Sequence, residues 1–170
     1  VWVREKDSFN EWQLHRDEAS LNGWKREDIM EGIVHVNLPM SEEYTPQLLN
    51  YDLSGVINFS KGCYTGQEII ARMHYRGNAK KRLFLLTGKN SIQDSSEVIQ
   101  RYGGKEIISK VLAFSNSYEE LDNSVLLAIL NITNEQSSYS LSTPNQKEST
   151  LNSTPLSSYI NQVSDEDIIE

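Results

Sequence analysis

The feature that most constrains the fold is a series of short apolar runs in the second half of the chain. Turns containing glycine or asparagine separate these runs, which cover residues 82–87, 97–99, 107–114 and 124–130. Short apolar runs at this spacing, bounded by turn residues, are typical of antiparallel strands. The sequence therefore predicts an α+β fold in which a small antiparallel β-barrel occupies residues 79–155.

The first half of the chain carries helical signals instead. A Ser–Glu capping pair predicts a helix over residues 8–19. The Asn-Gly pair at 22–23 predicts a turn, and a second short helix follows over 24–31, which Gly32 can terminate. Prolines and glycine then bracket residues 39–55, where we expect a loop without regular structure.

A motif around the single cysteine follows this loop. It reads Lys61-Gly62-Cys63-Tyr64-Thr65-Gly66-Gln67-Glu68-Ile69-Ile70-Ala71-Arg72-Met73-His74-Tyr75-Arg76. Thr65 and Glu68 have the spacing of a capping box, which predicts that a helix begins here. The glycines on either side of the cysteine allow tight turns. Because the apolar run 56–59 predicts a short strand, the expected local order is strand, turn, cysteine, helix.

The position of Cys63 ahead of this helix bears on its chemistry. A thiol near a helix N-terminus lies at the positive end of the helix dipole, which favours the thiolate, and Lys61 and Arg72 could add to this effect. The alternative is that Cys63 is a small apolar residue in the core, since free cysteines are among the most buried residue types. The sequence leaves both alternatives open.

Charge is distributed unevenly along the chain. The net charge is -8, yet residues 61–82 carry a local balance of +5, and the remaining residues carry ten basic and 23 acidic side chains. The basic residues of this island are Lys61, Arg72, Arg76, Lys80, Lys81 and Arg82. An acidic chain with one basic island is expected to use it for binding an anion, and the alternative is a solvated positive surface.

Several classes of site are excluded by counting. A single cysteine cannot form an internal disulfide or a multi-cysteine metal or cluster site. The three histidines, His15, His35 and His74, lack the spacing of metal ligands, so we predict no metal site. No apolar run approaches the roughly 20 residues that a membrane-spanning helix needs, so we expect no membrane partner.

The cysteine motif also carries a resemblance. Lys-Gly-Cys-Tyr-Thr-Gly-Gln-Glu, followed by Ala-Arg, Tyr-Arg-Gly and Lys-Arg, closely resembles the signature of the YgfZ family. Members of this family are folate-binding relatives of the glycine-cleavage T-protein, and their mitochondrial counterparts assist iron–sulfur cluster assembly. Residues in the order of the family also occur upstream, namely Trp24, Ile29 to Gly32, Pro46-Gln47, Asn50 and Gly55. The resemblance covers residues 1–130 well and the remainder poorly.

The resemblance implies a domain organisation. Residues 1–78 would be the C-terminal part of a T-protein-like folate-binding domain, and 79–155 would be the small β-barrel domain. Residues 156–170 form an acidic segment that we expect to be a disordered tail. Within 134–161 the composition shifts to polar residues, which bury little apolar surface. We therefore expect a longer protein whose N-terminal half is missing here, and no autonomous enzymatic activity in this fragment.

The resemblance also implies site residues. Trp24, Lys61, Gln67 and Arg72 would contact tetrahydrofolate, and Cys63 would be a functional thiol. Physically, an indole offers a stacking surface for a pterin, and cations suit the carboxylates of a folate tail. The alternatives are structural. Trp24 can anchor its helix in the core, Arg72 can pair with Glu68 one helical turn away, and both Gln67 and Asn50 can satisfy backbone groups in turns. Asp52 is expected to be a loop residue rather than a catalytic carboxylate.

Three functions remain as hypotheses. The first is a cytoplasmic, folate-binding YgfZ-like protein that supports iron–sulfur cluster assembly or repair, and thereby tRNA modification. Its partners would be iron–sulfur enzymes such as tRNA-modifying enzymes, with a tRNA contact through residues 61–82. The second is a folate-dependent aminomethyltransferase-like one-carbon enzyme. The third is a non-catalytic RNA-binding module that uses the basic island.

Overall fold

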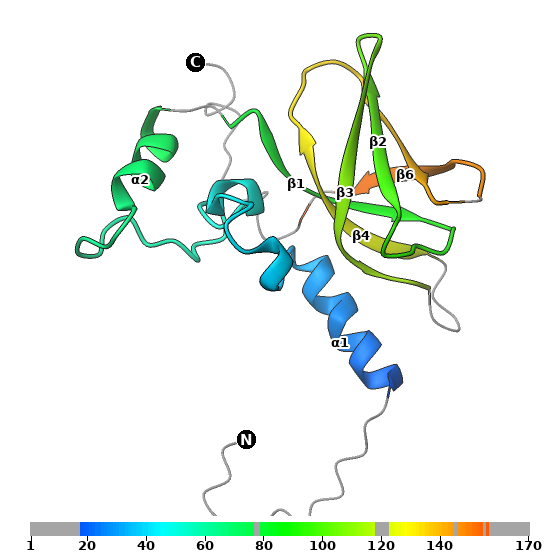
Figure 1. Cartoon of the computed structure of the whole chain (residues 1–170), viewed down its shortest axis with the longest axis horizontal. Coiled ribbons are helices and arrows are strands. Elements are labelled where there is room, and N and C mark those ends of the chain that lie inside the picture. Colours follow the sequence, from blue (N-terminus) through cyan, green and yellow to red (C-terminus); the bar gives the residue numbers. More distant parts are fainter. Residues whose placement is uncertain (1–17, 77–78, 118–122, 145, 155, 157–170) are drawn as a thin grey trace, which may run out of the picture.

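The fold consists of a few helices followed by a six-stranded β-barrel (Figure 1). The computed structural model describes residues 18–76, 79–117, 123–144, 146–154 and 156. The helical elements are α1 (Glu18–Met30), the 3-10 helices η2 (Leu38–Met40) and η3 (Pro46–Leu49), and α2 (Gln67–Arg76). The strands are β1 (Lys81–Gly88), β2 (Glu97–Tyr102), β3 (Lys105–Ser115), β4 (Ser124–Asn131), β5 (Ser138–Ser142) and β6 (Ser149–Thr154).

The barrel is closed and antiparallel throughout. Its strand order is β1-β4-β3-β2-β5-β6, and β6 returns to pair with β1. Gly103 and Gly104 connect β2 to β3 with φ angles of 54° and 73°, the left-handed backbone that a two-residue hairpin turn requires. The predicted α+β class and the predicted small antiparallel barrel are confirmed.

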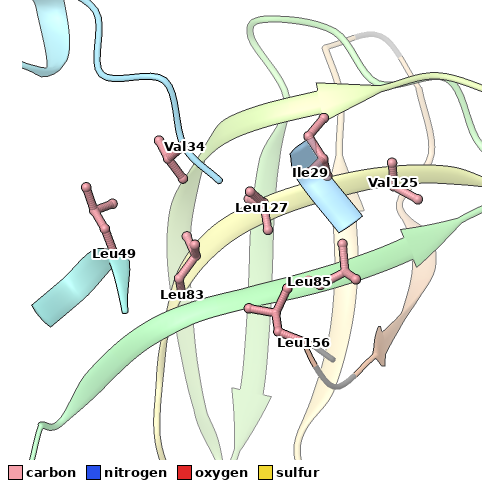
Figure 2. Packing of buried hydrophobic residues seen from close by; sticks show 8 residues of the cluster. All are labelled: Ile29, Val34, Leu49, Leu83, Leu85, Val125, Leu127 and Leu156. Carbon is pink, nitrogen blue, oxygen red and sulfur yellow. The ribbon is translucent and has the colours of Figure 1, made fainter. Parts of the chain in front are cut away.

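Strands β1 and β4 are buried on both faces, which explains their continuous apolar sequences. One face points into the barrel, where Leu86, Leu126 and Leu130 pack with residues of β2, β5 and β6. The other face forms a second cluster with residues from the helical half (Figure 2). The members of this outer cluster are Ile29, Val34, Leu49, Leu83, Leu85, Val125, Leu127 and Leu156. The helical half therefore packs on the outside of the barrel.

The division into domains at residue 78 stays a prediction. The outer cluster joins side chains from both sides of that position. Leu156, the first residue assigned to the acidic tail, is buried in this cluster, and the residues after it lie outside the described part of the chain. The predicted helix over 8–19 also lies mostly outside the described residues.

The predicted turn at residues 22–23 is wrong, because α1 runs through both residues. The helix is fixed to the barrel further along, where Ile29 is buried and Arg26 Nη1 donates to the Asn123 carbonyl at 3.0 Å. These contacts outweigh the cost of about 1 kcal/mol for a glycine in a helix interior. The predicted stop at Gly32 is confirmed: its φ is 73°, and its N–H donates to the Ile29 carbonyl at 3.0 Å.

One further expectation about strands is wrong. Residues 56–59 form no strand; the Asn58 side-chain oxygen accepts from the Ser60 N–H at 2.8 Å, a local turn that competes with strand pairing. The polar region after residue 134 supplies β5 and β6 of the predicted barrel and, as its composition predicted, buries little apolar surface. Each of these strands needs few apolar side chains to complete the barrel interior, and Leu141 and Leu151 supply them.

Polar side chains help to hold this closing hairpin. Arg101 of β2 donates to Ser140 of β5 at 2.8 Å and to Glu148, just before β6, at 2.9 Å. The Ser140 hydroxyl also donates to Glu148 at 2.9 Å. The hydrogen bonds from Ser140 and from Arg101 lower the pKa of the Glu148 carboxyl below its usual value. The Arg101 side chain thus adds to the backbone pairing that already joins β2 to β5.

Carboxamide side chains replace missing backbone partners at the ends of strands. The Asn50 amide donates to the Leu83 carbonyl at 2.9 Å, and its oxygen accepts from the Leu83 N–H at 3.3 Å. Gln100, fully buried in β2, makes the same pair of bonds with the backbone of Asn131, both at 2.9 Å. These side chains occupy the place of a neighbouring strand. The Asn50 bonds attach the loop after η3 to β1.

We predict that Asn50→Ala destabilises the protein by about 2 kcal/mol or more. The change leaves two buried backbone groups of Leu83 without partners. It also removes a residue type that tolerates the left-handed backbone at position 50, where φ is 59°. Urea unfolding followed by circular dichroism measures the effect. Asn90→Ala, at an exposed position, is the matched control and should change the free energy of unfolding by less than about 0.5 kcal/mol. Equal effects of the two variants would contradict this account.

Candidate functional site

The cysteine motif folds into an exposed turn that leads into α2. Cys63 is exposed, which rules out the alternative that it is a buried core residue. Gly66 turns the backbone into the helix with a φ of 86°. The hydrogen bonds of the described residues do not include the predicted capping box of Thr65 and Glu68; instead the Tyr64 N–H donates to the Gln67 side-chain oxygen at 3.3 Å. The Gln67 N–H donates back to the Tyr64 carbonyl at 3.1 Å.

Ring contacts order the rest of this segment. The Lys61 ammonium lies 4.9 Å from the centroid of the Tyr64 ring, a cation–π distance. Phe59, ahead of the motif, stacks on His74 of α2 with 3.9 Å between ring centroids. The two ends of the segment are therefore held together. These contacts leave the thiol of Cys63 at the surface.

Helix α2 is attached to the rest of the molecule through η3. Gln47 of η3 donates from Nε2 to the Ile70 carbonyl at 2.8 Å. Part of α2 is open to solvent: Ile69 is 66% exposed, and Arg72 is also exposed. The ion pairs among the described residues do not include one between Arg72 and Glu68. Arg72 therefore presents its charge to solvent.

A small cleft of about 280 Å³ lies between α2, η3 and the start of β1. Its lining residues are Gln47, Leu48, Met73, Ala79, Lys80, Lys81 and Arg82. Arg82 does not offer its charge to an anion here, because its Nη1 donates to the Asp52 carboxylate at 2.5 Å and to the Gln47 carbonyl at 3.0 Å. Among the side chains of the basic island that the structure describes, the solvent-facing cations are Lys61, Arg72, Lys80 and Lys81.

Asp52 has a structural position. Its side chain is 2% exposed and that of Arg82 is 18% exposed, so the ion pair is buried. It joins the loop after η3 to the first residues of β1, beside the Asn50 bonds to Leu83. Asp52 is therefore a loop residue, as expected, and its carboxylate pairs with Arg82.

We predict that Asp52→Asn destabilises the protein by about 3 kcal/mol, because it leaves a largely buried guanidinium without its counter-charge. Glu106→Gln is the matched control. It removes a partner from the exposed Arg101–Glu106 pair at 2.7 Å, whose contribution is expected to be below about 1 kcal/mol. Chemical denaturation of the two variants in parallel measures the difference. A loss for Asp52→Asn no larger than that for Glu106→Gln would contradict the structural role of the buried pair.

Trp24 lies on a different part of the molecule, on α1. Its side chain is 57% exposed, so it does not anchor the helix in the core, which Ile29 does instead. The Trp24 ring stands against the ring of His35, with 5.5 Å between centroids. His35 in turn pairs through Nε2 with Asp28 Oδ2 at 2.8 Å. The chain reversal at Gly32 brings His35 back beside the last turns of α1.

A larger groove, of about 510 Å³, lies beside this cluster, between α1 and the end of β3. Its residues are Asn22, Lys25, Asp28, Ile29, Ile33, His35, Asn37, Asp94 and residues 112–117, which cover the end of β3 and the two residues after it. Apolar side chains such as Ile29 and Phe114 line it together with charged ones. Its volume is within the range of about 300–1,000 Å³ that is usual for small-molecule sites.

The predicted site residues thus fall into two groups. Lys61, Cys63, Gln67 and Arg72 share the segment at α2, whereas Trp24 stands on α1, which lies apart from α2 (Figure 1). Sequence reasoning missed His35 and Asp94 as groove residues. The signal available for His35 was its place just after the helix-ending Gly32, since such a stop folds the chain back on the helix.

Comparison with known families adds no assignment: a scan against protein-family models finds no model that matches this chain. In the described part of the chain, no helix is long and apolar enough to cross a membrane. Nor do three or more His, Cys, Asp or Glu side chains come together as metal ligands among these residues.

We predict that Cys63 is alkylated by iodoacetamide at a similar rate in the native and the urea-unfolded protein, because its thiol is at the surface. Mass spectrometry of timed samples measures the rate. Cys63→Ser is the control and should take up no label, since the chain has one cysteine. Labelling that requires unfolding would contradict the exposed position of the thiol.

Proposed function

We propose that this chain belongs to a folate-binding, YgfZ-like protein that supports iron–sulfur cluster assembly or repair, and thereby tRNA modification, in the cytoplasm. Cys63 is its functional thiol. The observation that carries the proposal is the exposure of Cys63 within the Lys-Gly-Cys-Tyr-Thr-Gly-Gln-Glu motif. A cysteine that only packs in the core can be buried, whereas a thiol that reacts with a partner must be accessible to solvent.

The folate part of the proposal is supported by the surroundings of Trp24. Its indole is largely exposed and stands beside a groove of suitable volume, as a stacking surface for a pterin would. In this proposal residues 1–78 are the C-terminal part of a T-protein-like domain, and a preceding half of the same protein completes the folate site. Lys61 and Arg72 then reach the bound tetrahydrofolate in the assembled protein, rather than within the groove itself.

Gln67 has a smaller part in this proposal than its motif position implied. Its side-chain oxygen accepts from the Tyr64 N–H, so it shapes the cysteine turn. The solvent-facing Lys80 and Lys81 suit a contact with the phosphates of a tRNA substrate of the partner enzyme. The aminomethyltransferase-like alternative gains no support from Asp52, whose carboxylate is buried against Arg82.

We predict that Cys63→Ala abolishes the support of iron–sulfur enzymes without unfolding the protein, because the side chain is exposed and its loss leaves no cavity. Cells depleted of the protein are complemented with either form, and tRNA methylthiolation is measured by mass spectrometry of nucleosides. Tyr64→Phe is the matched control, since it keeps the ring beside Lys61 and should complement fully. Full complementation by Cys63→Ala at an equal protein level would falsify the thiol role.

A further inference from the structure

We infer that the acidic segment 157–170 of this chain docks in the small cleft between α2, η3 and the start of β1. The segment reads Ser-Ser-Tyr-Ile-Asn-Gln-Val-Ser-Asp-Glu-Asp-Ile-Ile-Glu, with four acidic and no basic side chains. Composition predicted a disordered tail here, and the inference gives the segment a binding site instead. It is argued from the direction in which β6 leads the chain, an open edge of β1, a buried acceptor in the cleft wall and opposite charges.

Strand β6 directs the residues that follow it toward this cleft. It runs antiparallel to β1, and its register pairs Thr154 with Leu85. The chain after Thr154 therefore heads toward the first residues of β1. Leu156 agrees with this direction, because it is buried in the outer cluster together with Leu83 and Leu85 (Figure 2).

The segment is long enough to reach the cleft. Along a strand, Leu83 and Lys81 are about 7 Å apart. The nine residues 157–165 span up to about 30 Å when they are extended. The connection through Leu156 also keeps the segment at a high effective concentration beside the cleft, so individually weak contacts are sufficient to hold it there.

The edge of β1 beside the cleft has backbone groups available for pairing. Strand β6 pairs with β1 over residues 85–87, and Asn50 takes both backbone groups of Leu83. Because the backbone groups of a strand alternate between its two sides, the N–H and C=O of Lys81 point to the same side as those of Leu83. None of the described strands pairs with Lys81 on that side. An extended segment can therefore add hydrogen bonds there.

The wall of the cleft also contains a buried acceptor without a partner. Gln47 lines the cleft, is 3% exposed, and donates from Nε2 to the Ile70 carbonyl. Its Oε1 is buried and accepts no hydrogen bond from the residues that the structure describes. Buried polar oxygens normally have a donor, so this one points to a donor from outside those residues. A peptide brings such donors in its backbone N–H groups and in side-chain amides such as those of Asn161 and Gln162.

The charges of the cleft and of the segment are opposite. Lys80 and Lys81 line the cleft, both are exposed, and the ion pairs found in the described ranges include neither. The residues Asp165, Glu166 and Asp167 form a consecutive run, which we call the acidic run. Carboxylates of this run can pair with the two ammonium groups, and such complementarity favours this surface over the acidic remainder of the chain.

The apolar part of the cleft has a matching part in the segment. Leu48, Met73 and Ala79 line the cleft beside the lysines, and Met73 is 38% exposed. Ile168 and Ile169 directly follow the acidic run. Covering Met73 with these side chains would remove apolar surface from water, which is favourable. A segment that is both acidic and apolar therefore fits this cleft better than a nucleic acid, which brings charge without aliphatic side chains.

Docking has a consequence for the anion that the proposed function brings to this surface. The segment would cover Lys80 and Lys81 and would therefore compete with the phosphates of a tRNA. This consequence rests on the proposed function, whereas the docking itself does not.

Cross-linking with a carbodiimide tests the docking in the unmodified protein. The reagent joins a lysine amine to a carboxylate where the two are in contact, and mass spectrometry of the peptides identifies the pair. We expect Lys80 or Lys81 to be joined to the acidic run, at a yield that is independent of protein concentration and falls with added salt. Lys89, exposed at the other end of β1, is the matched control and should give no such product.

Two results of this experiment would overturn the inference. One is an acidic run that is cross-linked to Lys89 as often as to Lys80 and Lys81. The other is a product that forms only between separate chains, which a mixture of isotopically labelled and unlabelled protein reveals.

A fluorescent peptide of residues 157–170 measures whether the cleft is already occupied. The whole chain is used with its acidic run neutralised by Asp165→Asn, Glu166→Gln and Asp167→Asn. By fluorescence anisotropy, the peptide should bind this variant at least about tenfold more tightly than the native chain, whose own segment competes. Adding Lys80→Gln and Lys81→Gln should abolish binding, whereas adding Lys89→Gln should leave Kd unchanged. Equal affinity for the native and the neutralised chain would overturn the inference.

A short oligouridylate separates the docking from the proposed function. Tighter binding of this RNA to the neutralised chain than to the native chain supports competition at Lys80 and Lys81. Cross-links to these lysines without any RNA binding support the docking and overturn the tRNA contact of the proposed function. RNA binding that neutralisation leaves unchanged, together with no cross-link, overturns the docking and leaves the tRNA contact standing.

Discussion

The attachment of the loop after η3 to the start of β1 is the interaction on which the arrangement of the helical half depends. Asn50 satisfies both backbone groups of Leu83, and Asp52 neutralises Arg82 in the same region. These hydrogen bonds and this ion pair are buried and directional, so they fix the orientation of the loop on β1, which apolar packing alone would leave undetermined. Leu49 then lies in the outer cluster, and Gln47 can reach the backbone of α2. The position of Cys63 thus follows from contacts made more than ten residues before it.

The strands with the clearest sequence signal are β1 and β4, which are buried on both faces. In β1 and β4 one row of side chains fills the barrel and the other forms the outer cluster, so the sequence reads as an uninterrupted apolar run. Strands β5 and β6 give a weaker signal, because Leu141 and Leu151 alone reach the interior cluster from them as buried residues. The serines of β5 and β6 are typical of a loop sequence. The two strands pair with β2 and β1, which lie far away along the chain.

The part of the candidate site that consecutive residues form could be predicted from the sequence. The part that residues far apart along the chain form could not. The cysteine turn and its helix arise from consecutive residues, and the motif placed them within one residue of the observed start. Whether Cys63 is buried depends on what packs over it, which no local pattern contains. The groove combines Asp28 of α1, His35 after the helix stop and Asp94 from the β1–β2 connection. No periodicity links these positions, because closure of the barrel and the reversal at Gly32 bring them together.

The groove beside α1 and the cleft beside α2 both lie next to the outer cluster. Ile29, which lines the groove, and Leu49, which is next to the cleft residue Leu48, belong to the same outer cluster on β1 and β4. A ligand in the groove and a partner at the cysteine turn would therefore contact opposite margins of one packed layer. A close-packed layer has low compressibility and transmits strain, but it changes its arrangement only where a second packing of the layer exists. The outer cluster and the hydrogen bond from Gln47 to the Ile70 carbonyl thus form a continuous set of contacts from the groove to the helix that follows Cys63.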